Sequence, residues 1–247
     1  MLQRFFLALL AAWGAMASAA EVQVAVAANM AAPMQKIAAE FKRATGHDAQ
    51  LAIGSTGKFY AQIQAGAPFE VLLAADEETP AKLEKEGFTV PGTRFTYARG
   101  KLVLWSADSA KVDAQGRLLI RAPEGKLAIA DPRLAPYGAA AMETLARLNV
   151  LAAWKPNIVQ GENIGQAFQF ASTGAAPYGF VALAQVMEGG KITKGSAWIV
   201  PGNLYSPLKQ DAVLLRKGEA NEAARALMSF LKSDAVHETL RGYGYEF

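Results

Sequence analysis

Five short segments of this sequence consist mostly of small, neutral residues that can donate hydrogen bonds. They occupy residues 27–30, 54–58, 74–76, 130–138 and 160–165, and each follows a short apolar run. Such segments can bind an anion without a cationic side chain, because the start of a helix offers unpaired N–H groups and the positive end of the helix dipole. Ser, Thr, Asn and Tyr add side-chain donors. The predicted ligand is an anion that the protein encloses.

Each of these polar residues also has an ordinary structural explanation. Asn29, Ser55 and Thr56 are typical helix N-cap residues. Tyr137 is typical of a half-buried aromatic residue whose hydroxyl is satisfied locally. The acidic residues at 76–78 favour the first turn of a helix rather than a metal cluster. The anion interpretation therefore depends on several segments meeting at one edge of a sheet, where open α/β proteins bind ligands.

Several other chemistries are excluded by the residues present. The sequence has no Cys and only two His, so thiol catalysis, cysteine zinc sites and iron–sulfur clusters are excluded, and His-dependent metal sites are disfavoured. Residues 54–58 (GSTGK) resemble a phosphate loop, but Ala52 and Phe59 occupy positions where that motif needs Gly and Ser or Thr. No serine-hydrolase or zinc-protease motif is present. A binding protein is favoured over an enzyme.

The N-terminus has the pattern of a signal peptide. Arg4 precedes an apolar run at 5–13 and small residues at 17–20. A membrane span is disfavoured because the run is short and Gly14 interrupts it. Residues 1–20 are therefore predicted to be removed on export to the periplasm. The formal net charge of +3 gives no basic field for nucleic acid.

The segments named above must be positioned by alternating strands and helices. Strands are expected at 22–26, 50–53, 71–74 and 126–130, and helices at 30–41, 59–65, 80–86, 138–148, 221–232 and 234–241. In the first helix Met30, Met34, Ile37, Ala38 and Phe41 share one face. This alternation predicts an α/β fold with mostly parallel sheets.

Two strand-like segments break the alternation because no helix follows them promptly. They are 101–105 and 206–215. If the chain crosses between two lobes there, the first lobe comprises residues 21–101 and 206–247, and the second comprises residues 102–205. Each is then of domain size.

The chain resembles the periplasmic molybdate-binding proteins of ABC importers over nearly its whole length after residue 20. The resemblance is carried by residues 24–30 (VAVAANM), 54–57 (GSTG), 62–71 (QIQAGAPFEV), 73–76 (LAAD), 127–132 (LAIADP), 176–181 (APYGFV), 230–231 and 241–244. It implies a type II periplasmic binding protein, with two lobes joined by two crossing segments, that closes on molybdate or tungstate. It also implies an ABC permease of the inner membrane as partner, a monomer, and neither a cofactor nor a directly ligated metal cation.

The resemblance also implies which residues bind the oxyanion. They are Asn29, Ser55 or Thr56, Ala75 through its backbone N–H, Tyr137, and Ile164 through its backbone N–H. Two positions depart from the family pattern: Asn29 stands where Ser is frequent, and Ala182 stands where a Tyr is common, with Tyr137 as the substitute donor. A receptor for sulfate, phosphate or an organic acid, and a secreted α/β enzyme, are the alternatives. An organic carboxylate typically requires an Arg clamp, which these segments lack.

Overall fold

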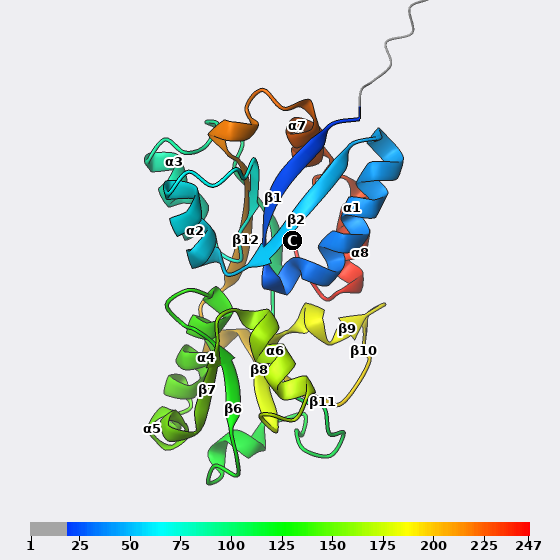
Figure 1. Cartoon of the computed structure of the whole chain (residues 1–247). Coiled ribbons are helices and arrows are strands. Elements are labelled where there is room, and N and C mark those ends of the chain that lie inside the picture. Colours follow the sequence, from blue (N-terminus) through cyan, green and yellow to red (C-terminus); the bar gives the residue numbers. More distant parts are fainter. Residues whose placement is uncertain (1–18) are drawn as a thin grey trace, which may run out of the picture.

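The computed structural model describes residues 19–247, which form two lobes drawn one above the other in Figure 1. The first lobe is built on a five-stranded sheet in the order β2-β1-β3-β12-β4. Its strands are β1 (Glu21–Ala27), β2 (Asp48–Gly54), β3 (Val71–Leu73), β4 (Phe95–Gly100) and β12 (Leu208–Leu214). Its helices are α1 (Ala31–Thr45), α2 (Thr56–Gln64), α3 (Glu78–Lys85), α7 (Glu222–Phe230) and α8 (Asp234–Gly242), and a 3₁₀ turn, η1 (Ala28–Met30), precedes α1.

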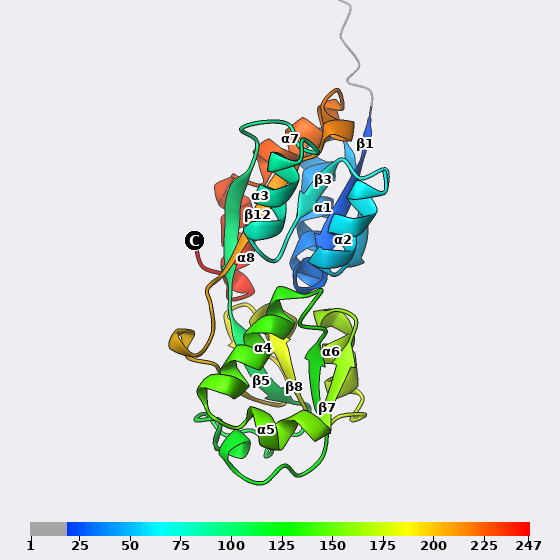
Figure 2. The ribbon, with the colours of Figure 1, turned by 90° about the vertical axis from the view of Figure 1, so that its left-hand side faces the viewer.

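Helices cover both faces of this sheet (Figure 2) because the side chains of a strand alternate between its faces. In β1, Val24 and Val26 pack in the cluster with α1, α7 and α8, whereas Ala25 packs with α2 and α3. Met34 and Phe41 of α1 are fully buried, as the helical spacing predicted. Both apolar clusters thus hold the carboxyl ends of the strands in fixed positions.

The second lobe has a five-stranded sheet in the order β11-β5-β8-β6-β7. Its strands are β5 (Leu102–Ser106), β6 (Leu127–Ala130), β7 (Ile158–Gly161), β8 (Tyr178–Ala182) and β11 (Ser196–Ile199). Its helices are α4 (Pro136–Arg147), α5 (Leu151–Trp154) and α6 (Ile164–Ser172), and a hairpin, β9 (Met187–Glu188) and β10 (Lys191–Ile192), projects from it.

Each sheet is parallel except for one strand. In the first sheet β12 runs against β3 and β4, and in the second β5 runs against β8 and β11. The chain passes from the first lobe to the second between β4 and β5, and it returns between β11 and β12. Each reversed strand, β5 or β12, is the first strand after such a passage. A strand that enters from the interlobe side starts where its neighbours end, so it must run antiparallel to them. The predicted α/β fold with mostly parallel sheets is confirmed.

The structure differs from the predicted elements at several helix starts and contains further strands and helices for which no bounds were predicted. α2, α3 and α4 begin at Thr56, Glu78 and Pro136, which is two or three residues earlier than expected. Pro136 at the first position of α4 is favourable because proline has no N–H to leave unpaired there. No bounds were predicted for β4, β7, β8, β11, α5 or α6, and in β4 the residues Arg99 and Gly100 obscure the strand pattern. The correction at α4 matters most, since it places Tyr137 inside the first turn of a helix.

The predicted signal peptide, residues 1–20, falls almost wholly outside the described residues. Within residues 19–247, no helix combines the length and apolar character needed to cross a membrane.

Candidate functional site

The six predicted site residues all line one small cavity between the lobes. It is formed by residues of five helix-start segments: Ala27, Ala28 and Asn29; Gly54, Ser55 and Thr56; Ala75; Ala135, Pro136 and Tyr137; and Asn163 and Ile164. None of these lining residues is charged. The cavity has a volume of about 10 Å³, which is the room that about one water molecule needs. The cavity is therefore too small for an organic molecule of many atoms.

Ser55 and Thr56, which the sequence could not distinguish, have different partners. Ser55 occupies the N-cap position of α2 but makes no side-chain cap bond, and its Oγ is buried with no hydrogen-bond partner. The Thr56 Oγ1 accepts a hydrogen bond from the Ala75 N–H at 3.0 Å. The capping explanation is therefore wrong for Ser55. Its hydroxyl is available to a ligand, while Thr56 fixes the segment after β3.

Asn29 lies in η1 and does not cap a helix. Its Nδ2 donates to the Gln210 Oε1 at 2.9 Å and to the Tyr245 hydroxyl at 2.9 Å. Its Oδ1 is buried and has no partner. A buried polar atom without a partner costs free energy, so both Asn29 and Ser55 mark the cavity as a place where a ligand completes the hydrogen bonding.

Tyr137 is the second residue of α4 and is only 1% exposed. Its hydroxyl oxygen accepts a hydrogen bond from the Gln210 Nε2 at 3.1 Å. The alternative of a half-buried tyrosine with a local partner is therefore wrong. Burial raises the pKa of Tyr137 well above its usual value, so this residue keeps its proton and can donate it.

Ile164 is the first residue of α6, where an N–H group has no acceptor within the helix. The Asn163 Oδ1 caps the next two N–H groups, those of Gly165 at 2.9 Å and Gln166 at 3.1 Å. In the first turn of α6, the Ile164 N–H is therefore the backbone group that remains able to donate to a ligand in the cavity. The Ala75 N–H, by contrast, is engaged with Thr56.

Three residues of this region were not predicted: Tyr97, Gln210 and Tyr245. Gln210 is fully buried, and its side chain contacts both Asn29 and Tyr137. The one available signal was a polar pair, Gln210 and Asp211, inside the otherwise apolar β12. A register shift between these two residues lets both be buried. Tyr245 follows the last helix and carried no signal of its own.

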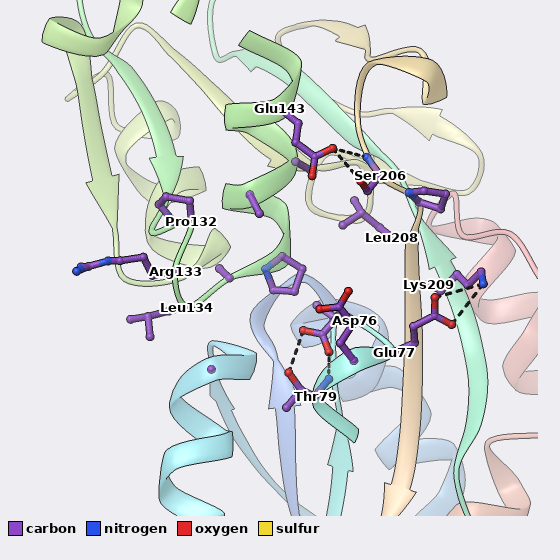
Figure 3. A pocket seen from close by; sticks show the side chains of 18 residues that line it. Asp76, Glu77, Thr79, Pro132, Arg133, Leu134, Glu143, Ser206, Leu208 and Lys209 are labelled. Carbon is purple, nitrogen blue, oxygen red and sulfur yellow. Dashed lines mark hydrogen bonds and ion pairs between the residues drawn. The ribbon is translucent and has the colours of Figure 1, made fainter. Parts of the chain in front are cut away.

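A larger groove of about 400 Å³ lies beside the cavity and is shown in Figure 3. Its lining includes the carboxylates of Asp76, Glu77, Glu78 and Glu143, which disfavour an anion. The Asp76 Oδ1 accepts from the Thr79 N–H at 2.8 Å, so this carboxylate stabilises the start of α3 as expected. Burial raises the Asp76 pKa, and the hydrogen bonds from Thr79 oppose this shift. Among residues 19–247 no group of three or more His, Asp or Glu could hold a metal ion.

The two lobes touch around the cavity. The Gly57 N–H of α2 donates to the Leu134 carbonyl oxygen of the second lobe at 2.9 Å. Lys58 forms an ion pair with Glu162 across the same boundary. Lys58 is thereby neutralised beside the cavity, and the arrangement is that of a closed molecule.

The β9–β10 hairpin makes further contacts between the lobes. Lys36 of α1 and Glu188 of β9 lie 2.5 Å apart, and the Gly190 N–H donates to the Gly242 carbonyl oxygen at 3.0 Å. Side chains and backbone therefore join the lobes at more than one place.

Comparisons with known proteins agree with this architecture. A model of the family described as bacterial extracellular solute-binding protein matches residues 22–246. The molybdate-binding protein ModA of Azotobacter vinelandii is 57% identical over 229 residues, covering 93% of this chain and 91% of the relative. ModA of Rhodobacter capsulatus is 52% identical over 231 residues, covering 93% and 89%. The solved periplasmic molybdate-binding protein of Azotobacter vinelandii superposes with a TM-score of 0.88 at 40% identity, covering 92% of this chain and 99% of that one.

Proposed function

Because this chain belongs to the family of bacterial extracellular solute-binding proteins, we propose that it captures molybdate between its lobes and delivers it to an ABC permease. Membership of this family also confirms the prediction of a binding protein of solute transport rather than an enzyme. The observation that carries the choice of ligand is an uncharged cavity lined by buried donors, of which the Ser55 hydroxyl has no partner.

In this proposal the oxyanion accepts hydrogen bonds from the Ser55 hydroxyl, from the Ile164 N–H, and from either the Tyr137 hydroxyl or a turned Asn29 amide. It also lies beside the Ala75 N–H, which Thr56 engages. A hydrogen bond to a charged group contributes about 1.5–3 kcal/mol. Closure excludes water, and each bond then acts in a lower dielectric. Neutral donors are therefore sufficient for tight binding of a dianion, and no metal cation or cofactor is needed to hold it.

Selectivity follows from size and from protons. Molybdate and tungstate have the same charge and shape, so tungstate is expected to bind as well. Sulfate offers the same acceptors on a smaller ion, so a cavity closed around molybdate holds it at longer distances. Phosphate retains a proton at neutral pH, and once the Asn29 amide turns to donate to the anion, the cavity leaves this proton unpaired.

Closure is proposed to move the first lobe, residues 21–101 and 206–247, against the second, residues 102–205. The crossing at Lys101 is then one hinge and that at Ser206 the other. Between them the Leu102 N–H donates to the Tyr205 hydroxyl at 3.2 Å, which ties the two crossing segments together. The exported protein is proposed to act in the periplasm as a monomer, since one chain supplies both halves of the cavity.

Isothermal titration calorimetry with molybdate, tungstate, sulfate and phosphate tests the proposal. Calorimetry is preferred to tryptophan fluorescence because Trp105, Trp154 and Trp198 are all buried inside the second lobe, away from the cavity. We expect molybdate and tungstate to bind at least tenfold more tightly than sulfate. Tightest binding of sulfate or phosphate would favour the alternative receptors.

The Tyr137→Phe variant tests the site itself. It should weaken molybdate binding by about tenfold, which is the cost of one hydrogen bond to a charged ligand. Tyr178→Phe is the matched control, because the Tyr178 hydroxyl donates to the Glu124 carbonyl oxygen at 3.0 Å, within the second lobe. Equal affinities of the two variants would remove Tyr137 from the site.

A further inference from the structure

The Gln210 side chain bonds to both Asn29 of the first lobe and Tyr137 of the second. We propose that Gln210 is a positioning residue that couples these two ligand donors, so that the orientation of its amide decides which of them presents a proton to the oxyanion. This inference rests on the proposed function of the cavity.

The coupling follows from the number of protons available. In the structure Gln210 accepts from the Asn29 Nδ2 at 2.9 Å and donates from Nε2 to the Tyr137 hydroxyl oxygen at 3.1 Å. Since the Tyr137 oxygen accepts here, its own proton can be donated either to a ligand or to the neighbouring Tyr245 hydroxyl. The Asn29 amide is turned the other way: its donors face Gln210 and Tyr245, and its Oδ1 is buried without a partner.

An oxyanion beside the Asn29 Oδ1 would meet lone pairs, so Asn29 must turn by 180° to donate. Its Oδ1 would then face the Gln210 Oε1, and Gln210 must turn as well. In that orientation the Gln210 Oε1 lies against the Tyr137 hydroxyl and accepts a hydrogen bond from it, so this hydroxyl no longer donates to the anion. The two candidate donors therefore exchange roles through Gln210 and do not act independently.

The surroundings of Gln210 tolerate both orientations. The Tyr97 hydroxyl, 3.1 Å from the Gln210 Oε1, can give its proton to the Ala74 carbonyl oxygen at 2.9 Å instead, so its oxygen can accept from the turned amide. The Tyr245 hydroxyl donates to the Asn29 carbonyl oxygen at 3.0 Å and can donate to the turned Asn29 Oδ1. No proton has to leave the cluster.

The packing of this pair depends on Gly100, the last residue of β4 beside the crossing at residue 101. A Cβ at Gly100 would lie 2.0 Å from the Tyr137 hydroxyl oxygen and 2.4 Å from the Gln210 Nε2. Only glycine therefore lets Tyr137 reach Gln210 in the closed molecule. The contact between Tyr137 and Gln210 therefore lies directly beside the segment where the chain passes from the first lobe to the second.

A comparison of two double-mutant cycles tests the coupling. Calorimetric Kd values for molybdate are measured for Asn29→Ala, Tyr137→Phe and the double variant, first in the wild-type chain and then with Gln210→Met. We expect the Asn29–Tyr137 interaction in the wild-type chain to exceed that in the Gln210→Met chain by at least about fivefold in Kd. Equal Asn29–Tyr137 interactions in both backgrounds would overturn the coupling. If Gln210 had only a structural role, its replacement by Met would lower the affinity for molybdate but leave the Asn29–Tyr137 interaction unchanged.

The Gln210→Glu variant provides a second readout. A protonated glutamic acid still has one donor and one acceptor, whereas the carboxylate only accepts and repels the anion. The titratable groups facing it are Tyr97, Tyr137 and Tyr245, with Asp76 and Asp211 nearby and Asp211 paired with Arg94 at 2.7 Å. Affinity should fall by at least about tenfold between about pH 6 and pH 9, because burial raises the pKa of a carboxyl into that range.

Gln50→Glu, on the exposed side of β2, is the matched control and should follow the wild type. A Gln210→Glu profile as flat as that of the control would refute the proposal. Gly100→Ala, which displaces Tyr137 from Gln210, should weaken binding by at least tenfold; an unchanged Kd would also count against it. If the wild-type chain binds none of the four oxyanions, the proposed function fails, whereas binding with unchanged coupling removes only the role of Gln210.

Discussion

Substitution of Gly57 by Ala separates closure of the lobes from the stability of the fold. Gly57 is the second residue of α2, and its N–H reaches the Leu134 carbonyl oxygen of the other lobe at 2.9 Å. An added Cβ would lie 3.0 Å from the Leu134 Cα and 3.1 Å from its oxygen. Both are backbone atoms, so a change of side-chain rotamer cannot relieve the contact. The lobes would have to separate by a few tenths of an ångström.

The size of the effect can be estimated from the cost of overpacking. Such contacts cost about 1–3 kcal/mol, and about 1.4 kcal/mol corresponds to a tenfold change in Kd. Because the contact exists only in the closed form, we expect Gly57→Ala to weaken molybdate binding by about tenfold. In the open, ligand-free protein, alanine in a helix is more favourable than glycine by up to about 1 kcal/mol. The ligand-free variant should therefore unfold at the same or a higher temperature than the wild type.

Calorimetry of the loaded protein and thermal unfolding of the ligand-free protein together measure the two effects. Gly202→Ala is the control, because a Cβ on this glycine of a 3₁₀ turn meets no atom within 4 Å. It should leave the Kd for molybdate unchanged. A wild-type Kd in Gly57→Ala would refute the argument that this contact belongs to the closed state. So would a loss of unfolding free energy in the ligand-free variant as large as its loss of binding free energy.

The remaining predictions concern single groups around the cavity. Ser55→Ala should raise the Kd for molybdate about tenfold by calorimetry, because it removes a buried hydroxyl that the ligand completes; a change below twofold would contradict this. Lys58→Met should change the Kd by no more than about fivefold, since the ion pair with Glu162 is exposed; a larger change would mean that this pair controls closure. Wild-type affinity should stay constant between about pH 6 and pH 9, because burial raises the pKa of Tyr137 far above this range; titrations that weaken before the upper limit would show that its proton is lost. Burial also raises the pKa of Asp76, so the folded state holds that proton more tightly than the unfolded state and stability is lost as the pH rises through the folded pKa. Asp76→Asn should therefore resist denaturant better than the wild type at neutral pH, with a smaller difference toward about pH 4; a difference that does not depend on pH would be the contrary result.

The order of strands and helices was accessible from the sequence for most of the first lobe, because side-chain periodicity is a local property. In the second lobe β7, β8, β11, α5 and α6 were missed. The buried face of α1, with Met30, Met34, Ile37 and Phe41, follows from spacing alone. The small residues after each strand were equally visible, and parallel strands bring such segments to one edge of a sheet. The six candidate residues therefore come together as expected, without any need to know their contacts.

The choice between Ser55 and Thr56 required the folded chain. Both hydroxyls stand at the start of α2, and propensities for helix capping do not distinguish them. The position of the Ala75 N–H, brought close by β3, engages Thr56 and leaves Ser55 without a partner. The helix start at Pro136 likewise decides that the Tyr137 hydroxyl points to Gln210 rather than to a local acceptor.

The sequence by itself determined the alternation of elements in the first lobe and the neutral character of the donor segments, because each of these depends on neighbouring residues. Tertiary structure alone decided which protons face the cavity. Asn29 bonds to Gln210 and Tyr245 across 181 and 216 positions of the chain, and Tyr137 meets Gln210 across 73. Hydrogen-bond direction depends on which groups approach within about 3 Å, and residues so far apart approach only after both sheets have formed and the lobes have met.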